Sequence, residues 1–350
     1  MKLPDLKKAD LKNKRVLVRV DFNVEFSEGG GIKEKYRIET AKKTIDFILS
    51  KKGTRLALLS HLGRPEGREE KFSLEKIYKD TGRILGMNLI FVPECFGGEV
   101  KKALDNLKPG EALMLENIRF FSEESENDKN FAGKIAENFD AYVNEAFGAS
   151  HRLHSSVAAI TDFLPSYAGF NLQKETDELG AAREKFNRPA VAIIGGAKIE
   201  TKLPVISFLE KKYDWVLVGG RLGIEAEKQK IIFGANVILA EDYLKDGLDI
   251  GPKTIEKFKE KIKDAKTIIW NGPLGKFEDP NFAFGTEQIL EAVWQNKEAK
   301  KIAGGGETVQ VLEEHGVLEN FDFVSTGGGA MLEFLAKGDL PALEELRDNY

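Results

Sequence analysis

The hydrophobic pattern of the chain alternates between short apolar runs and longer stretches with apolar residues at helical spacing. RVLVRV (15–20) is the first run, and IETAKKTIDFILSKK (38–52) is the first helical stretch. Such alternation is typical of parallel sheets with helices on both faces. The runs predicted as strands are 15–20, 55–59, 88–92, 111–115, 141–144, 190–194, 215–218, 236–240, 267–270, 300–303 and 322–325. Residues 73–86 and 127–139 are further predicted helices.

So many strands exceed one compact sheet, and the pattern therefore predicts two doubly wound α/β domains. The length of 350 residues agrees with two domains. We expect an N-terminal domain over 1–170, a connecting helix over 171–186 and a C-terminal domain over 187–336. A charge-rich helix of this kind is most often a solvated surface helix, and only its place between two sheet patterns makes it a candidate connector.

Composition and charge narrow the class of protein. The formal net charge is −5, which argues against a nucleic-acid-binding protein because those usually carry a basic excess. No apolar signal segment or membrane-length apolar run is found in the sequence. Cys95 is the single cysteine, so no disulfide can form within the chain, in agreement with a reducing compartment. We expect a soluble cytoplasmic protein that binds neither nucleic acid nor membrane.

Polar clusters follow the predicted strands, where open α/β sheets bind their ligands. In the first half these clusters hold arginines and three of the four histidines, namely Arg37, His61, Arg64, Arg119, His151, Arg152 and His154. Arginine forks suit carboxylates and phosphates, although single arginines mostly pair with surface acids. The histidines are candidate metal ligands as well, but no cysteine or acid cluster accompanies them, which favours anion contact over zinc.

The second half has glycine-rich turns after its strands, namely GGAK (195–198), GG (219–220), NGPLGKFE (271–278), GGGET (304–308) and TGGGA (326–330). Free backbone N–H groups and the helix dipole favour phosphate at such turns. The strict GxGxxG and GxxxxGK[ST] patterns are absent. Lys198 follows the first turn, and Lys202 lies four residues on at the same helix face, where a plain surface lysine is the alternative.

No Ser–His–acid set is found along the chain. Arginines in one half, with lysines and backbone amides in the other, suit a reaction between two anions. Such a reaction needs charge neutralisation and alignment more than it needs a base.

With these motifs in this order, the chain resembles the phosphoglycerate kinase family from about Lys14 to Leu335. The motifs are RVLVRVDFNV, SHLGRP, LENIRF, NEAFGASHRLHSS, GGAKIETK, LDIGPKT, WNGPLGKFE and STGGGA. The resemblance implies two Rossmann-like domains joined by a helix across a cleft, with the segment 337–350 returning to the N-terminal domain. It also implies a monomer that reversibly transfers a phosphoryl group from 1,3-bisphosphoglycerate to ADP with Mg²⁺, giving 3-phosphoglycerate and ATP by domain closure and without a covalent intermediate. The attacking carboxylate of the reverse reaction is already ionised, so no general base is needed.

The resemblance also assigns residues. The phosphoglycerate would be held by Asp21, Asn23, Arg37, His61, Arg64, Arg119 and Arg152. The nucleotide would contact Lys198, Lys202, Gly219, Asn271, Pro273, Glu278, Gly304, Gly305, Gly306, Glu307 and Thr308. The transferring group would be stabilised by Arg37, Lys198 and the backbone amides around Gly305 and Gly328. Mg²⁺ would meet Glu307, where the family has an aspartate.

Three departures from the family pattern keep other hypotheses open. After VLVGG the family continues with methionine, alanine and a Thr–Phe pair, whereas this chain has RLGIEAEK and a shortened stretch before LDIGPKT. Glu145 and Glu307 each stand where the family has aspartate. A relative that binds phosphoglycerate or a protein partner without catalysis is therefore an alternative, and a dehydrogenase with a nonstandard dinucleotide turn is a weaker one. For Glu307, the alternative to a metal ligand is a first-turn glutamate favoured by the helix dipole.

Overall fold

The computed structural model describes residues 1–26 and 31–349, and it divides into two compact units. Unit 1 comprises Met1–Asp177 and Asp339–Tyr350, and unit 2 comprises Glu178–Gly338. Each unit contains a six-stranded sheet in which all the pairings are parallel. The predicted class, α/β with two doubly wound parallel sheets, is confirmed.

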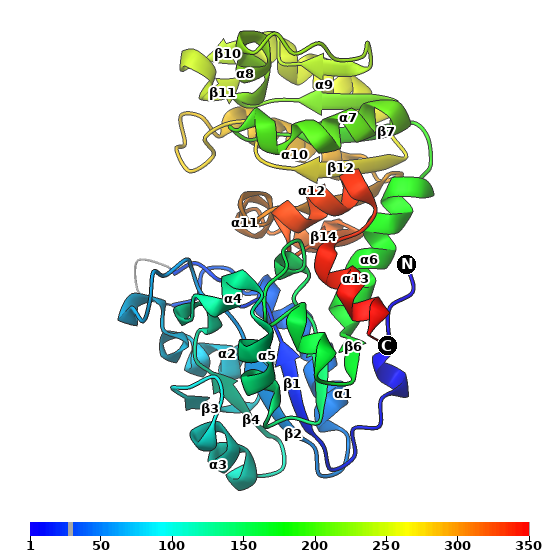
Figure 1. Ribbon diagram of the computed structural model, residues 1–350. Coiled ribbons are helices and arrows are strands. Elements are labelled where there is room, and N and C mark those ends of the chain that lie inside the picture. Colours follow the sequence, from blue (N-terminus) through cyan, green and yellow to red (C-terminus); the bar gives the residue numbers. More distant parts are fainter. Residues whose placement is uncertain (27–30, 350) are drawn as a thin grey trace. The chain divides into compact units, whose positions relative to one another are not determined.

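The sheet of unit 1 has the strand order β3-β4-β2-β1-β5-β6 (Figure 1). Its strands are β1 (Arg15–Arg19), β2 (Arg55–Leu59), β3 (Asn88–Val92), β4 (Glu111–Leu115), β5 (Ala141–Asn144) and β6 (Ser166–Ala168). The edge strand β6 was not predicted, because three residues are too few to show a pattern. It pairs with β5 just before residue 170, where the sequence predicted the end of the N-terminal domain.

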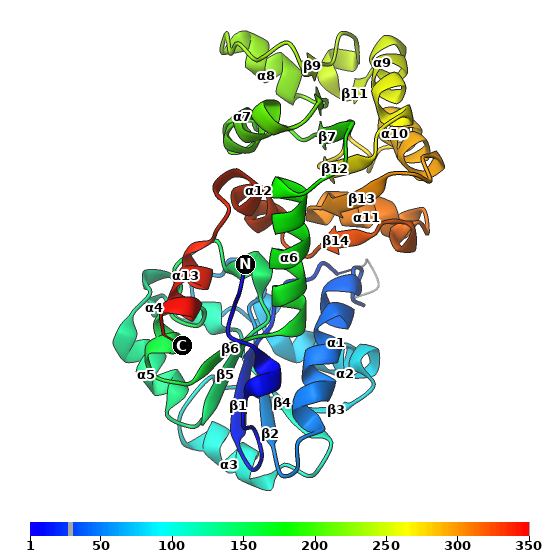
Figure 2. The same cartoon turned by 90° about the vertical axis from the view of Figure 1, so that its right-hand side faces the viewer.

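Helices cover both faces of this sheet, with α1 and α2 on one side and α4 and α5 on the other (Figure 2). Alternate residues of β1 enter different cores: Val16 and Val18 pack with Ile45 of α1, whereas Leu17 packs with Leu104 of α3. The helices of unit 1 are α1 (Tyr36–Leu49), α2 (Tyr78–Leu85), α3 (Gly98–Asn106), α4 (Glu123–Glu126), α5 (Lys129–Ala136) and α13 (Pro341–Asp348). Its short 3₁₀ turns are η1 (Leu6–Lys8), η2 (Glu70–Phe72), η3 (Leu74–Lys76), η4 (Ile118–Phe120), η5 (Phe147–Ala149) and η6 (Ala159–Asp162).

The predicted helix over 73–86 is wrong in its first part. The buried carboxylate of Glu116 accepts hydrogen bonds from the Ser73 hydroxyl (2.7 Å) and the Leu74 N–H (2.8 Å). These contacts hold the segment in a 3₁₀ turn, and the α-helix begins only at Tyr78. A partner more than forty residues away thus overrides the local helical pattern.

The sheet of unit 2 has the order β14-β13-β12-β7-β8-β9. Its strands are β7 (Ala190–Ile194), β8 (Trp215–Val218), β9 (Val237–Leu239), β12 (Thr267–Asn271), β13 (Lys300–Gly304) and β14 (Phe323–Ser325). The chain runs outward from β7 to β9 and then returns to β12 on the other side of β7. Turns at the carboxyl ends of β7 and β12 therefore flank the switch point of the sheet, which is where such folds bind ligands.

Figure 2 shows α7 and α12 on one face of this sheet and α9, α10 and α11 on the other. The helices are α7 (Leu203–Lys212), α8 (Leu222–Lys228), α9 (Pro252–Lys263), α10 (Phe284–Gln295), α11 (Gly306–Glu314) and α12 (Gly328–Lys337). The 3₁₀ turns are η7 (Ile199–Thr201), η8 (Lys245–Gly247) and η9 (Leu318–Asn320). A two-stranded antiparallel ribbon of β10 (Tyr243–Leu244) and β11 (Asp249–Ile250) encloses η8.

The helix α6 (Phe170–Glu184) contains the boundary between the two units, which falls after Asp177. The chain returns to unit 1 at Asp339, and the N–H of Ala342 in α13 donates to the Ser150 carbonyl at 3.2 Å. Among residues 1–26 and 31–349, no helix is both long and apolar enough to span a bilayer.

Candidate active site

The candidate residues of unit 1 lie where strands of one sheet end. Asp21 and Asn23 follow β1, and His61 and Arg64 follow β2. Arg119 lies in η4 after β4, Arg152 follows β5 and η5, and Arg37 occupies the first turn of α1. We call these seven residues the unit 1 cluster. Parallel strands place their carboxyl ends at one edge, which explains how residues distant in sequence can contact one another.

Asp21 is the centre of the unit 1 cluster. Its carboxylate accepts a hydrogen bond from Arg37 (3.4 Å) and lies 3.8 Å from Nε2 of His61. Arg37 also donates to Glu34 at 3.1 Å. Burial alone would lower the pKa of Arg37, but the carboxylates of Asp21 and Glu34 outweigh it and raise that pKa. Arg37 is therefore a fixed positive charge, held by two acids that the protein itself supplies.

Arg119 has a different electrostatic setting. Its guanidinium donates to the Gly63 carbonyl at 2.8 Å, and the Gly63 N–H donates to the Asn23 side chain at 2.7 Å. Burial and the neighbouring Arg19 lower the pKa of Arg119 to about 10. A cation destabilised in this way by burial and by another cation marks a place where an anion would be stabilised.

A buried network beneath the unit 1 cluster was missed by the sequence analysis. Arg19 is fully buried, donates to Ser156 (2.7 Å) and contacts Nδ1 of His61 at 3.1 Å. Glu124 accepts from the N–H and hydroxyl of Ser156 and lies 3.8 Å from Arg19. The signal was available, because an arginine inside an otherwise apolar strand requires a buried partner.

His61 and His154 are neutral neighbours of these arginines. Burial, with Arg19 and Arg119, lowers the pKa of His61 well below its ordinary range, and burial with Arg119 lowers that of His154 to about 4. Arg152 is exposed and donates to His151 at 3.2 Å, and Arg64 is exposed. Over residues 1–26 and 31–349, no group of three or more His, Cys, Asp or Glu side chains is placed to hold a metal.

In unit 2 the glycine turns after β7, β8 and β12 interlock. The N–H of Gly195 donates to Asn271 O (2.9 Å), and the N–H of Gly196 donates to Pro273 O (3.1 Å). A Cβ on Gly195 would lie 2.1 Å from Pro273 O, and one on Gly219 would lie 2.4 Å from the Leu274 side chain. Glycine is therefore required here by close backbone packing at the switch point, whatever the ligand.

The side chains of Asn271 and Thr308 form hydrogen bonds that hold these turns in place. Asn271 is buried; its amide donates to Gly304 O (2.8 Å), and its oxygen accepts from Nζ of Lys202 (2.5 Å). The buried Thr308 hydroxyl accepts from the Gly272 N–H at 2.8 Å. Both side chains are thus occupied within the protein, and their contacts position Lys202 and the backbone of the turns.

Two helices begin at adjacent turns in unit 2. Gly305 has φ 107° and precedes α11, and Gly328 begins α12. A Cβ on Gly328 would lie 2.6 Å from Cα of Gly305, so the two turns are in contact. Their N–H groups and helix dipoles make this pair a suitable place for phosphate.

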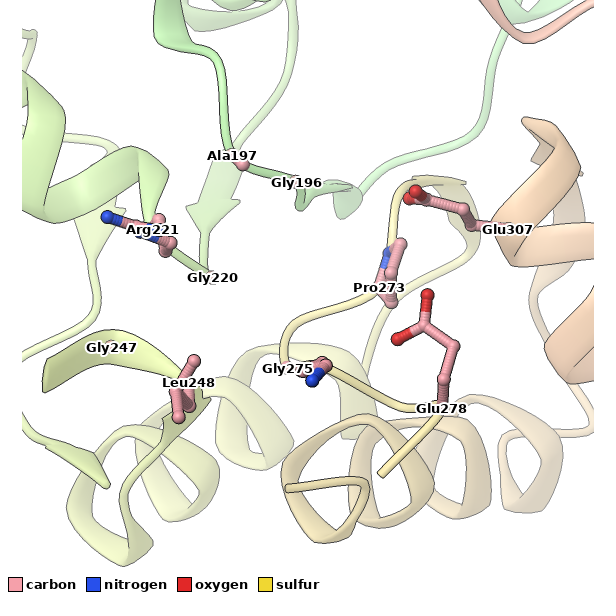
Figure 3. Close-up of a pocket in the computed structure, with 11 residues that line it drawn as sticks. Gly196, Ala197, Gly220, Arg221, Gly247, Leu248, Pro273, Gly275, Glu278 and Glu307 are labelled. Atoms are coloured by element: carbon pink, nitrogen blue, oxygen red, sulfur yellow. The ribbon is translucent and has the colours of Figure 1, made fainter. Parts of the chain in front are cut away.

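A cavity of about 240 Å³ opens beside these turns in unit 2 (Figure 3). It is lined by Gly196, Ala197, Gly220, Arg221, Gly247, Leu248, Pro273, Gly275, Lys276, Glu278 and Glu307. Pro273, Glu278 and Glu307 were predicted, whereas Arg221 and Lys276 were missed. Lys276 lies within the NGPLGKFE motif but was not singled out, and Arg221 lies where the sequence departs from the family pattern. Lys198 is exposed and follows Ala197 directly.

Glu307 lies in the first turn of α11. Its carboxylate and that of Glu278 both point toward the cavity (Figure 3). Burial lowers the pKa of Lys202 to about 8, and the negative charge of Glu307 opposes this shift. Carboxylate oxygens are ligands that Mg²⁺ prefers, and a Mg²⁺ that arrives on nucleotide phosphates needs only one or two of them from the protein. Both side chains therefore fit a bound Mg²⁺–nucleotide.

Two parallel α/β units, one with a cationic cluster and the other with interlocked phosphate-type turns, define a two-domain phosphotransferase that needs no protein nucleophile. The family model described as phosphoglycerate kinase matches residues 6–232 and 225–338. The chain belongs to the phosphoglycerate kinase family.

Relatives along the whole chain agree. The phosphoglycerate kinase of Dictyoglomus turgidum is 40% identical over 390 aligned positions that cover 98% of each chain, and that of Pseudothermotoga lettingae is 39% identical and covers 99% of each. Solved phosphoglycerate kinases from Coxiella burnetii (30% identity, TM-score 0.79) and Pyrococcus horikoshii OT3 (26%, 0.87) cover 99% of both chains. The alignment with the Dictyoglomus turgidum protein has 390 positions, more than the 350 residues of this chain. The family model matches in two segments that meet at residues 225–232, within the stretch that is shortened in this sequence.

Proposed function

We propose that this protein catalyses the reversible transfer of a phosphoryl group from 1,3-bisphosphoglycerate to Mg-ADP, giving 3-phosphoglycerate and ATP. An oxygen of the nucleotide β-phosphate attacks the phosphorus, and the bond from phosphorus to the acyl oxygen breaks and leaves a carboxylate. No proton is transferred, which agrees with a site of cations and amides. The observation that carries the proposal is the unit 1 cluster, because its arginines lie with Asp21, Asn23 and His61 near the carboxyl ends of neighbouring parallel strands.

Each residue has a separate task in this proposal. The unit 1 cluster would bind the carboxylate and phosphate of phosphoglycerate, and Arg37 would add charge to the transferring group. Lys198 would neutralise the same group, Lys202 would bind nucleotide phosphate, and the N–H groups at Gly305 and Gly328 would receive the developing charge. Mg²⁺, held by Glu307, would neutralise the nucleotide phosphates. We further expect a monomer that works in the cytoplasm.

The test is a coupled assay with 3-phosphoglycerate, Mg²⁺ and either ATP or GTP. We expect Lys198→Ala to lower kcat by about 10²- to 10³-fold with little change in the KM for 3-phosphoglycerate, as for loss of one group that stabilises transition-state charge. Lys253→Ala, an exposed lysine of α9 outside the cavity, is the matched control and should leave the rate unchanged. Absence of turnover with both nucleotides would refute the proposed reaction.

Glu307→Ala tests the metal assignment separately. It should raise the Mg²⁺ concentration needed for half-maximal rate. A variant that keeps the wild-type rate and Mg²⁺ dependence would leave Glu307 as a first-turn glutamate stabilised by the dipole of α11.

A further inference from the structure

Arg221 lies at the end of the unit 2 cavity opposite Glu307. Arg221 lines this end with Gly220, Gly247 and Leu248, while Glu278 and Glu307 lie on the other side (Figure 3). The residue follows β8 through the glycine pair, at the point where the sequence departs from the family pattern. Its side chain is exposed, and no hydrogen bond or ion pair to the described residues holds the guanidinium.

The direction of a bound nucleotide follows from the two ends of the cavity, and this step rests on the proposed function. The phosphates belong at the end where α11 begins, because Glu307 is in its first turn and Lys202 is close by. A ligand bound with its phosphates there extends its base toward Arg221. This end of the cavity is also lined by Gly247, the last residue of the shortened stretch, and by Leu248, the first residue of LDIGPKT.

The groups available to a base at this end are few. Gly220 and Gly247 have no side chains, Leu248 is apolar, and its carbonyl already accepts the Lys276 N–H at 2.7 Å. The Arg221 stem passes close to Gly247, since a Cβ there would lie 3.7 Å from Cγ of Arg221. No aromatic side chain lines the described cavity. Arg221 is thus the only side chain at this end that can read the edge of a base.

We infer that Arg221 makes unit 2 select purine nucleotides that carry oxygen at C6, such as guanosine and inosine nucleotides, over adenine nucleotides. A guanidinium has five N–H donors and no acceptor. Guanine and hypoxanthine present two acceptors, N7 and O6, side by side, which a guanidinium binds bidentately. Adenine presents N7 beside an amino group, so two donors would face each other.

The test is calorimetric binding of Mg-GDP, Mg-IDP and Mg-ADP to the full chain, with kcat/KM for the matching triphosphates. We expect GDP and IDP to bind at least about tenfold more tightly than ADP, in the range of one good bidentate contact to a base. Arg221→Met should reduce this ratio to near one by weakening GDP and IDP. Lys276→Met, which removes a different cation lining the cavity, should change all three affinities by the same factor.

Equal affinities in the wild type, or a preference that persists in Arg221→Met, would overturn the inference. So would a preference for GDP that IDP does not share, because the 2-amino group would then be the feature recognised. Turnover with no preference among the three nucleotides would refute the role of Arg221 but not the proposed reaction. The expected binding preference without turnover on any nucleotide refutes the proposed reaction alone.

Discussion

Lys202 is a residue whose charge changes near the pH at which an enzyme works. Its pKa is lowered to about 8, chiefly by burial, so the ammonium is present below that pH and is lost above it. If Lys202 binds nucleotide phosphate, kcat/KM for the nucleotide should fall as the pH rises through about 8, because this ratio reports the free enzyme. A pH–rate profile at saturating 3-phosphoglycerate measures the effect.

Lys202→Arg separates charge from structure in this prediction. Arginine stays protonated across the range, so the variant should lose the alkaline decline in kcat/KM even if its absolute rate is lower. The same decline in both proteins would assign the titration to another group. Lys202→Met should show weak nucleotide binding at every pH.

At the residue scale, the sequence predicted residues that belong to recognisable motifs. It missed the buried residues that form hydrogen bonds and ion pairs beneath them. Arg37, His61 and Lys202 lie in clusters that could be recognised from their neighbours. Arg19 and Glu124 were missed because their pairing joins β1 to α4, and no local pattern encodes that distance. Asn271 was predicted as a ligand contact, but its side chain is occupied by Lys202 and Gly304, which only three-dimensional contacts reveal.

At the scale of elements, the starts of α11 and α12 depend on a glycine with no room for a side chain. Gly328→Ala should lower the stability of unit 2 by about 1–3 kcal/mol, as expected for overpacking, because its Cβ would lie 2.6 Å from Cα of Gly305. Gly329→Ala is the matched control, since no atom lies within 4 Å of its Cβ. Its thermal denaturation should match or slightly exceed the wild type. Equal losses in both variants would contradict the packing argument.

The N-terminus of α6 is held by the buried carboxylate of Glu145. It accepts from the Thr44 hydroxyl (2.6 Å) and from the N–H groups of Asn171 (3.1 Å) and Leu172 (3.2 Å). Burial raises the pKa of Glu145 to about 8, against these hydrogen bonds, which lower it. The folded state therefore binds a proton that the unfolded chain releases near its ordinary pKa of about 4.5.

The stability that this proton contributes is fully present below about pH 4.5 and is lost as the pH rises through about 8. Glu145→Gln has no such titration. We expect the wild type to lose stability relative to Glu145→Gln between pH 5 and 9, as measured by chemical denaturation at each pH. A relative gain of the wild type over the same range would show that the hydrogen bonds, not burial, dominate.

The strands of both sheets were largely predictable because buried parallel strands give continuous apolar runs. The exceptions are short. β6, β10 and β11 have two or three residues each, and their pairing depends on neighbours rather than on composition. The prediction of a helix from residue 73 was wrong in its first part for a similar reason, because Ser73 and Leu74 donate hydrogen bonds to the distant Glu116.

On the scale of the whole molecule, α13 belongs to unit 1, the same unit as the N-terminal part of the chain. Leu343 of α13 is fully buried in unit 1, so Leu343→Ala should lower the stability of that unit by about 2–5 kcal/mol. The tryptophans Trp215, Trp270 and Trp294 are all in unit 2. The loss should therefore appear in far-UV circular dichroism and leave the fluorescence-detected transition in place.

Leu335→Ala, in α12 of unit 2 and also fully buried, is the counterpart. It should move the tryptophan transition to lower denaturant concentration. If either variant shifted both probes equally, the two units would be unfolding as one, contrary to this prediction.

The division of unit 1 between the two ends of the chain has a consequence for its synthesis. Unit 2 is one continuous segment, Glu178–Gly338, whereas unit 1 lacks α13 until Asp339–Tyr350 has left the ribosome. Domains fold as units while the chain emerges. The first residues to be made thus depend on the last, and the middle of the chain can reach its final structure before the beginning does.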